Sequence, residues 1–311
     1  MKEMLDVIIP VYKPGKEFLK LLHRLQQQEY PVHKIILMNT EQTYLDDLIS
    51  PEEMKEKYPK AEVHHLKKEE FDHAGTRDQG IHYSEAPYFL LMTQDALPAD
   101  RSLTARLMEA IEKKEMAAAY ARQLPREDCN EAERFTRGFN YPAESYVKSA
   151  QDLKRLGIKT YFCSNVCAIY NRSIYDELGG FQGRAIFNED MVYAAAAVKK
   201  GYQIAYCAEA EVIHSHNYTG KEQFHRNFDL GVSQAQHPEI FKEVPSESEG
   251  IRMVRMTAGH LKQKKRYGEI LKLIYVSGCK YVGYLLGKSY KHLPRFMIRA
   301  CTMSRSYWDN I

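Results

Sequence analysis

The sequence has few cysteines, a single tryptophan and no long run of apolar residues. Its 311 residues include six cysteines, and none has a partner at the close spacing typical of zinc sites. We therefore expect reduced, mostly buried thiols with no chemical role. They are Cys129, Cys163, Cys167, Cys207, Cys279 and Cys301. No segment reaches the roughly 18 consecutive apolar residues that a membrane-spanning helix needs.

The first six residues, Met1 to Asp6, lack the long apolar core of a secretion signal. Together with the lack of a membrane span, this predicts a cytoplasmic protein. The composition, with 44% hydrophobic and 27% charged residues, is ordinary for a globular chain that can bury a core.

Charge is nearly balanced over the whole chain but unevenly distributed. Residues 251–311 carry thirteen Lys or Arg against two Asp or Glu, while the total is 44 against 41. The preceding 250 residues are therefore net acidic. A basic tail without a recognition motif, on an acidic main part, is poor evidence for nucleic-acid binding, and we expect no nucleic-acid partner.

Strands and helices alternate through the first hundred residues. Short apolar runs predict strands at 5–9 (stopped by Pro10), 34–38 and 87–92, and a further short strand is expected at 62–66. Helical spacing or composition predicts helices at 18–25, near 46–57, and after Gly75. Alternation of this kind predicts an α/β fold with a mainly parallel sheet covered on both faces.

Beyond residue 100 the pattern is looser. We expect helices at 103–114, within 139–157 and at 191–200, strands at 116–120, 161–170 and 203–207, a loop or short helix at 122–138, a turn at 178–181, and helices from about 249 onward.

Asp95 follows the apolar run that ends at Met92, where open α/β sheets bind their ligands. It is either a helix cap or a ligand of a divalent metal that neutralises a diphosphate. His214 and His216 favour the metal, because histidines two residues apart point the same way on an extended chain. Imidazole and carboxylate together form a plausible shell for Mn²⁺ or Mg²⁺, and Mn²⁺ tolerates nitrogen better.

Other polar residues follow the strands in order. Pro10 and Tyr12 after the first strand, and Asn39 after the second, are candidates to border a nucleotide base. His73, Thr76 and Arg77 offer donors to a phosphate or ribose, and Gly75 allows close backbone approach. Each is also compatible with an ordinary turn.

Glu189 and Asp190 stand at an expected helix start, where a carboxylate commonly caps the helix. The functional alternative is general base catalysis, in which one of them, preferably Asp190, removes a proton from an attacking hydroxyl.

Five segments resemble one known family. They are Val7–Tyr12 (VIIPVY), Phe71–Arg77 (FDHAGTR), Met92–Ala96 (MTQDA), Asn188–Asp190 (NED) and His214–Tyr218 (HSHNY). The chain is similar, over about residues 4–240, to family-2 glycosyltransferases of the GT-A fold, and in particular to bacterial rhamnosyltransferases that build surface polysaccharides.

The resemblance implies a role for each candidate. Pro10, Tyr12, Asn39 and Arg77 would border the nucleoside, Gln94 and Asp95 would lie in the donor site, with Asp95 as the final aspartate of the metal motif. Asp190 would be the base, with Glu189 beside it, and His216 the preferred metal histidine. The chain departs from the family in having Gln94 beside a single aspartate, and Asn39-Thr40-Glu41 in place of an aspartate-bearing loop.

The resemblance also implies an inverting transfer without a covalent enzyme intermediate. The implied donor is dTDP-β-L-rhamnose and the implied acceptor a glycan or lipid-linked glycan. A UDP-hexose or UDP-hexosamine donor is the alternative within transferases, and a non-catalytic scaffold protein is the alternative outside them. We expect a GT-A catalytic domain at 1–248, with a nucleotide-binding half at 1–100 and an acceptor half at 101–248, followed by a basic helical extension at 249–311.

The basic extension combines Lys and Arg with apolar residues at helical spacing and several tyrosines. Such helices suit an anionic membrane surface, where a lipid-linked acceptor is presented. Packing on the catalytic domain, or on a second subunit of a homo-oligomer, is the alternative.

Overall fold

The computed structural model describes residues 3–181, 183–244 and 247–309. The chain forms two compact units that are interleaved along the sequence. The first comprises Met1–Leu124, Pro142–Arg184 and Glu189–His214; the second comprises Pro125–Tyr141, Ala185–Asn188 and Ser215–Ile311. The expected boundary at 248/249 falls inside the second unit.

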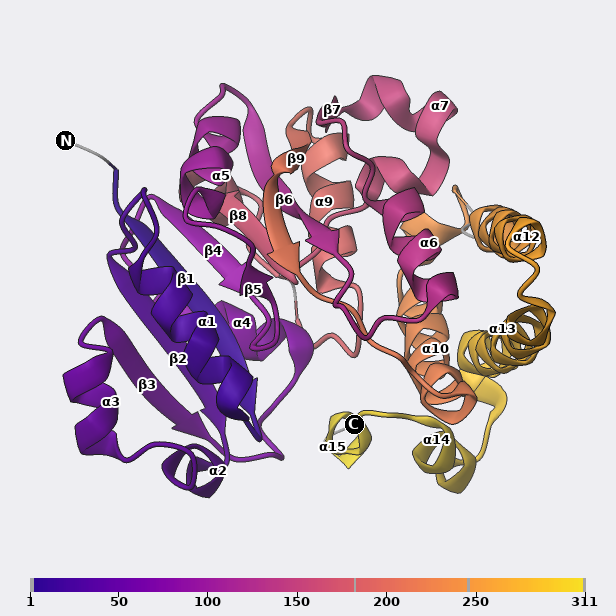
Figure 1. The fold of residues 1–311 in the computed structure, drawn as a ribbon, viewed down its shortest axis with the longest axis horizontal. Helices are drawn as coiled ribbons and strands as arrows, with labels where there is room; N and C mark the ends of the chain where they lie inside the picture. The colour runs from indigo at the N-terminus through magenta and orange to yellow at the C-terminus, as the bar shows by residue number, and fades with distance from the viewer. Residues whose placement is uncertain (1–2, 182, 245–246, 310–311) are drawn as a thin grey trace. The chain divides into compact units, whose positions relative to one another are not determined.

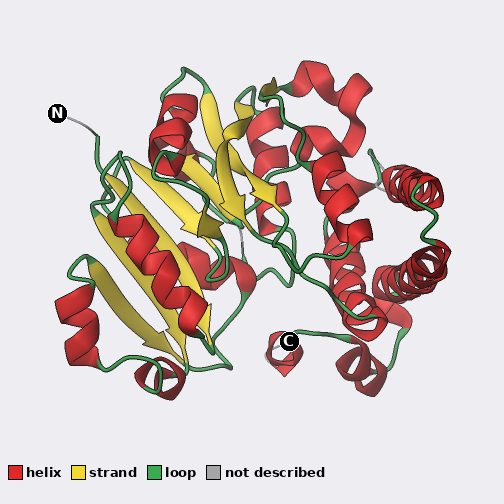
Figure 2. Cartoon of the chain, in the orientation of Figure 1, coloured by secondary structure: helices red, strands yellow, loops and turns green. Residues whose placement is uncertain are grey.

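A nine-stranded mixed sheet forms the centre of the first unit (Figures 1 and 2). Its order is β3-β2-β1-β4-β8-β6-β9-β5, and β7 also pairs with β9. The strands are β1 Leu5–Tyr12, β2 Lys34–Thr40, β3 Ala61–Leu66, β4 Tyr88–Met92, β5 Leu97–Pro98, β6 Met116–Leu124, β7 Tyr146–Lys148, β8 Cys167–Asn171 and β9 Gln203–Ile213. The neighbours β3, β2, β1 and β4 are parallel, whereas β8 is antiparallel to both β4 and β6.

Alternation along β1 explains how helices cover both faces of the sheet. Val7 and Ile9 enter a core that also contains Leu21 and Leu22 of α1 and Leu107 of α5. On the opposite face, a Cβ added at Gly80 of α4 would approach Ile8 Cγ2 to 2.5 Å and Met38 Cγ to 3.0 Å. Glycine therefore lets α4 lie close against the sheet.

The helices of the first unit are α1 Lys16–Gln26, α2 Gln42–Asp46, α3 Pro51–Lys57, α4 His73–His82, α5 Leu103–Ile111, α7 Leu153–Leu156, α8 Arg172–Glu177 and α9 Glu189–Lys199, with 3₁₀ turns at Ala150–Asp152 and Gly157–Tyr161. The helix expected near 46–57 is the shorter α3, which begins at Pro51 because Ser50 caps it there, while α2 already ends at Asp46.

Two further expectations differ from the structure. Pro10 does not end β1, which continues to Tyr12. The strand expected at 161–170 begins only at Cys167. The helix expected within 139–157 is present as the short α7, which follows the strand β7 and a 3₁₀ turn.

Helices make up the second unit. They are α6 Glu131–Asn140, α10 Gly220–Gln236, α11 Pro238–Phe241, α12 Glu247–Gln263, α13 Tyr267–Lys288, α14 Arg295–Cys301 and α15 Arg305–Asp309, with a 3₁₀ turn at Tyr290–His292. A small core contains Phe228 and Val232 of α10 together with Ile298, Tyr307 and Trp308. Within the described ranges, no helix combines the length and apolar character needed to cross a membrane.

Glycines bring α10 and α13 into backbone contact. A Cβ at Gly283 would collide with the Phe224 carbonyl, and a Cβ at Gly287 with the Phe228 carbonyl. The two helices therefore pack more closely than larger side chains allow, as in small-xxx-small helix pairs.

Candidate active site

The ends of β1 and β4 are joined by a side chain that reaches across the sheet. The Tyr12 amide donates to Gln94 Oε1 at 2.9 Å, and Gln94 Nε2 donates to the Tyr12 carbonyl at 2.8 Å. Gln94, expected in the donor site, thus acts as a clamp on the backbone of β1. Because Asp95 is its neighbour, the clamp also fixes where Asp95 stands.

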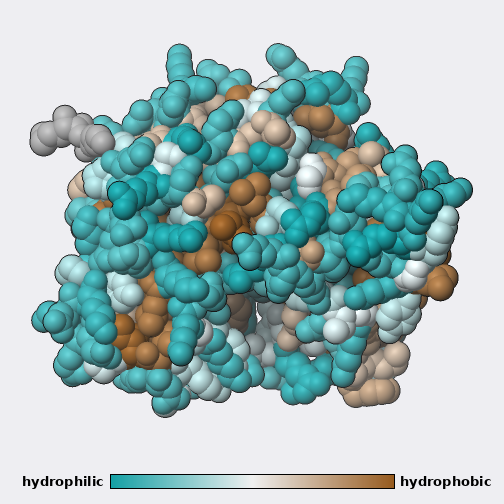
Figure 3. Space-filling model, in the orientation of Figure 1, coloured by the Kyte–Doolittle hydropathy of each residue, from teal (hydrophilic) through white to brown (hydrophobic). Residues whose placement is uncertain are grey.

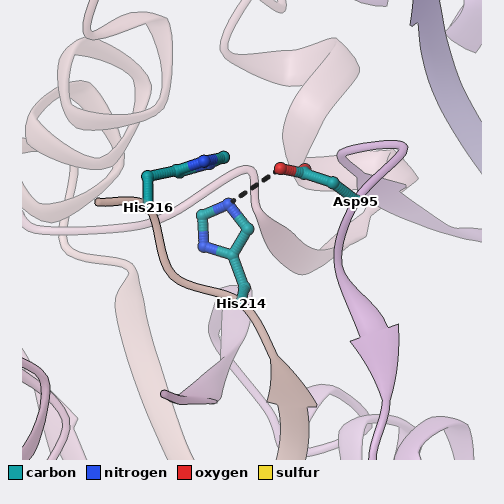
Figure 4. A group of neighbouring side chains, drawn as sticks. All are labelled: Asp95, His214 and His216. Atoms are coloured by element: carbon teal, nitrogen blue, oxygen red, sulfur yellow. Dashed lines mark ion pairs between the residues drawn. The ribbon is translucent and has the colours of Figure 1, made fainter. Parts of the chain in front are cut away.

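Asp95 meets the two histidines that follow β9 (Figure 4). His214 Nε2 lies 3.6 Å from Asp95 Oδ2, and one ligand atom each from Asp95, His214 and His216 lie within 4.8 Å of one another. His214 is buried, while Asp95 and His216 are partly exposed. The grouping expected from the sequence is therefore present.

The hydrogen bonds of His214 favour a cation at this place. Its Nδ1 lies 3.0 Å from Gln123 Oε1, and Gln123 Nε2 donates to Ser164 Oγ at 3.0 Å. With a carbonyl oxygen as partner, Nδ1 acts as the donor, and Nε2 faces the Asp95 carboxylate. A protonated imidazole would form an ion pair with that carboxylate, whereas a neutral one would share a bridging cation with it. An oriented second nitrogen is typical of metal-binding histidines.

Glu189 and Asp190 begin α9, and both carboxylates are held by the segment before β8. The Asn165 amide donates to Asp190 Oδ2 at 3.0 Å, and Asn165 Nδ2 donates to Glu189 Oε1 at 3.1 Å. Tyr170 OH donates to Asn165 Oδ1 at 2.6 Å, which fixes the orientation of that amide. Arg77 NH1 lies 3.3 Å from Glu189 Oε1, and both side chains are about 7% exposed.

These surroundings shift the pKa values of the two carboxyl groups in opposite directions. Burial and the adjacent charge of Glu189 raise the pKa of Asp190 to about 7, against the opposing effect of the Asn165 and Met191 amides. Burial alone would also raise the pKa of Glu189, but Arg77, His73 and Asn165 hold it below its ordinary value. Glu189 is thus the more readily ionised of the two, and Asp190 is suited to take up a proton near neutral pH.

Backbone contacts connect the Asp190 carboxylate with the loop of Asp95. Asn165, which binds Asp190, precedes Val166, and the Val166 carbonyl accepts from the Thr93 amide at 3.2 Å. Thr93 is two residues before Asp95 on the loop that leaves β4. Asp190, the candidate base, and Asp95, the candidate metal ligand, therefore belong to the same edge of the sheet.

The residues expected to border a nucleoside lie at the ends of β1 and β2. Tyr12 packs edge-to-face on Tyr44 at 5.6 Å between ring centroids, and Lys13 Nζ lies 4.9 Å from the Tyr44 ring centre. Asn39 is fully buried and lies 3.0 Å from His65 through Nδ2, while its Oδ1 is a buried acceptor with no partner among the described residues. Pro10 remains inside β1, paired with Met38.

The structure gives most of the His73–Arg77 segment local partners. Asp72 caps α4 by accepting from the amides of Ala74 and Gly75, and Thr76 Oγ1 accepts from the Asp72 amide at 3.3 Å. Arg77 donates to the His73 carbonyl and pairs with Glu189. Arg77 Nε remains buried without a partner in the described part of the chain.

Sequence reasoning did not identify Asn165, Tyr170 or Gln123. Asn165 lies 24 and 25 positions from the carboxylates it binds, and Gln123 lies 91 positions from His214. No local motif marks them, because their roles arise from strand pairing. The strand expected at 161–170 would have placed Asn165 in its middle, whereas Asn165 lies just before β8.

An α/β sheet with an Asp/His group and an acid pair at one edge is the arrangement of a GT-A glycosyltransferase. The family model "Glycosyl transferase family 2" matches residues 6–179, and the chain belongs to this family. It is a glycosyltransferase, as the sequence motifs predicted.

Two curated relatives match the chain over nearly its full length. One is the O-antigen chain rhamnosyltransferase RfbN of Salmonella typhimurium (strain LT2), 35% identical, with 99% of this chain and 96% of the relative covered. The other is the O-antigen chain rhamnosyltransferase WbaN of Salmonella anatum, 36% identical, with 98% and 96% covered.

Solved structures confirm the GT-A fold. The mannosyltransferase PcManGT from Pyrobaculum calidifontis, in complex with GDP-Man and Mn²⁺, has a TM-score of 0.61 at 14% identity and covers 94% of this chain and 87% of its own. S. aureus TarS 1-349 in complex with UDP has a TM-score of 0.52 at 14% identity, covering 93% and 91%.

Proposed function

We propose that this protein transfers L-rhamnose from dTDP-β-L-rhamnose to a hydroxyl group of a growing, lipid-linked cell-surface polysaccharide at the cytoplasmic face of the membrane. The observation that carries the proposal is the likeness to two curated rhamnosyltransferases along almost the entire chain. The geometry supports it, because the Asp/His group and the acid pair supply what a sugar-nucleotide transfer requires.

Asp95, His214 and His216 would hold the divalent cation, Mn²⁺ or Mg²⁺. Their ligand atoms are close enough to share one ion, and the hydrogen bond from His214 to Gln123 leaves Nε2 on the side of Asp95. When bound, the cation neutralises charge that develops on the departing diphosphate.

Asp190 would act as the general base. The acceptor oxygen forms a bond to the anomeric carbon while the bond from that carbon to the phosphate oxygen breaks. The nucleoside diphosphate departs, and the hydroxyl proton passes to Asp190. Displacement from the opposite side inverts the anomeric carbon. Glu189 would stay ionised because the charge of Arg77 compensates its own. Its carboxylate would orient Asn165 by accepting a hydrogen bond from the Asn165 side-chain amide.

The remaining candidates would form the donor site. Tyr12 with Tyr44 would provide an aromatic wall for the sugar nucleotide. The buried Asn39 Oδ1 would accept a hydrogen bond from that sugar nucleotide. Pro10, His73, Thr76 and Arg77 would shape the surrounding loops, and Gln94 would hold the two strand ends together.

The test is a donor screen that measures nucleoside diphosphate release with and without Mn²⁺, using dTDP-L-rhamnose, UDP-hexoses and UDP-hexosamines with a polysaccharide acceptor. We expect turnover with dTDP-L-rhamnose and loss of turnover in chelator. Turnover only with a UDP-sugar would assign the alternative donor.

Variants separate an enzyme from a scaffold. Asp190→Asn removes the base and should lower kcat by about 10²- to 10⁴-fold, with KM for the donor little changed. Asp95→Asn should instead weaken Mn²⁺ binding. Asp47→Asn, on an exposed residue, serves as the matched control. Unchanged turnover in both site variants, with intact folding by circular dichroism, would contradict catalysis at this site.

A further inference from the structure

Helix α13 exposes a continuous apolar face along most of its 22 residues. Large side chains on this face are 45–71% exposed: Tyr267, Leu271, Ile274, Tyr275, Tyr281, Val282 and Leu285. Tyr267, Leu271 and Ile274 follow one another at spacings of four and three residues, and Gly278, Tyr281 and Leu285 continue the same spacing. At 1.5 Å per residue the stripe is about 27 Å long.

The opposite face of α13 explains why the stripe remains outside. The helix buries Gly283, Tyr284 and Gly287, and the two glycines bring it against the backbone of α10. Tyr284 OH donates to Gln234 Oε1 of α10 at 2.8 Å. Tyr275 also reaches α10, because a Cβ added at Gly220 would lie 2.5 Å from its ring. The packing on α10 therefore uses small residues and two tyrosines, and it leaves the other large apolar side chains of the stripe in solvent.

No charged residue interrupts the stripe, and lysine residues flank it on both sides. On a helical projection, Lys272 follows the Tyr275 edge and Lys288 follows the Tyr281 edge. Lys288 Nζ lies 5.5 Å from the Tyr284 ring centre. Lysines beside an apolar face can extend toward phosphate groups while their stems remain in apolar surroundings.

The charge of the second unit indicates which partner fits. Its residues include nineteen Lys or Arg against twelve Asp or Glu, a net charge of +7, whereas the first unit is net −4. A second copy of the chain on this stripe would bring two net-positive units together. An anionic bilayer offers the opposite charge and an apolar interior.

The visible surface agrees with this distribution. Figure 3 shows brown and tan atoms at the right and lower right of the view, where Figure 1 draws α13 and α14. On α14, Phe296 is 72% exposed between basic residues, Arg295 and Arg299. Apolar and basic groups thus occur together on the second unit.

We propose that the exposed stripe of α13 docks the protein on an anionic lipid surface, with the helix lying in the plane of the membrane interface. Tyr267, Tyr275 and Tyr281 suit the interfacial region because each has an apolar ring and a polar hydroxyl. The inference rests on the proposed function only for its purpose, the approach to a lipid-linked acceptor; lipid binding itself needs no substrate.

The experiment is vesicle flotation with the full-length protein, using phosphatidylcholine vesicles with and without 30% phosphatidylglycerol. We expect at least about tenfold stronger binding to the anionic vesicles, and release at high salt. The double variant Leu271→Glu/Ile274→Glu should reduce binding by tenfold or more. Val147→Glu, which places the same charge on an exposed apolar residue of β7, should bind like the wild type.

Three results would overturn the proposal. They are no binding to either vesicle, equal binding by the Leu271→Glu/Ile274→Glu variant and the wild type, and a wild-type dimer in sedimentation velocity that this variant dissociates. The last would assign the stripe to a second copy. Release of nucleoside diphosphate with a soluble acceptor is measured in parallel, so failure of lipid binding and failure of the proposed function are distinguished.

Discussion

At the scale of single residues, Glu189 and Asp190 are neighbouring carboxyl groups whose pKa values are shifted in opposite directions. Arg77 and Asn165 stabilise the charge on Glu189, and burial together with that charge raises the pKa of Asp190 to about 7. If Asp190 must be ionised to accept a proton, kcat should rise with pH through about 7 and level off above it.

Glu189→Gln removes the charge next to Asp190 and should therefore lower its pKa. We expect the rise of kcat to move to lower pH, with much of the plateau rate retained. The measurement is a pH–rate profile of nucleoside diphosphate release. Glu56→Gln, on the exposed side of α3, should leave the profile unchanged. A profile that keeps its midpoint in Glu189→Gln would show that Asp190 is not the titrating base.

The sequence predicted the chemical groups of the site better than the residues that orient them. Asp95, His214 and His216 were grouped correctly because each stands at the end of a strand. Gln123 and Asn165 could not be predicted, since their hydrogen bonds depend on pairing between β6, β8 and β9 that one-dimensional spacing does not reveal.

At the scale of elements, apolar runs located the buried parallel strands well. β1, β2 and β4 lie within a few residues of their expected positions because each is a short apolar run bounded by polar or turn residues, and β3 also lies at its expected position. β7 was missed: three residues, stabilised by pairing with β9, carry too little pattern to identify a strand. The interleaving of the two units also depends on contacts between distant segments.

The pairing of α10 with α13 gives a test at this scale. Gly287→Ala places a methyl group against the Phe228 carbonyl, so the helices must separate, and we expect a loss of about 1–3 kcal/mol in unfolding free energy. Gly278→Ala is the matched control on the same helix. It has open space around it and should be stabilising by up to about 1 kcal/mol, from helix propensity.

Chemical denaturation followed by circular dichroism and by the single tryptophan, Trp308, measures both glycine variants. Trp308 belongs to the core of the second unit, so its fluorescence reports on that unit. Equal stabilities for Gly287→Ala and Gly278→Ala would contradict the close helix contact.

At the scale of the whole molecule, the polarised charge and the basic helical C-terminal part were predictable from composition. The stability of the folded protein should depend on pH, because buried carboxyl groups have shifted pKa values. Burial raises the pKa of Asp229 to about 7, although Thr302 Oγ1 donates to it at 2.6 Å and the Met303 amide at 2.9 Å. The folded protein keeps a proton there that the unfolded chain releases near pH 4.

Between about pH 4 and pH 7 the folded state thus holds more protons at Asp229 and Asp190, and their contribution to stability decreases as pH rises. Asp229→Asn removes one group and should make the slope of unfolding free energy against pH less negative, by at most about 1.4 kcal/mol per pH unit. Urea denaturation from pH 5 to pH 6.5 gives the slope, with Asp47→Asn as control. An unchanged slope would show that Asp229 titrates normally in the folded state.

The proposed reaction depends most on a cation bound by Asp95 and the two histidines next to the nucleoside diphosphate. The most direct measurement is a crystal structure with dTDP and Mn²⁺, with anomalous data collected at the manganese edge. We expect an anomalous peak at a coordination distance of roughly 2 Å from Asp95 Oδ2, His214 Nε2 and a ring nitrogen of His216, touching the diphosphate. A peak on the diphosphate but remote from Asp95 and both histidines would contradict it.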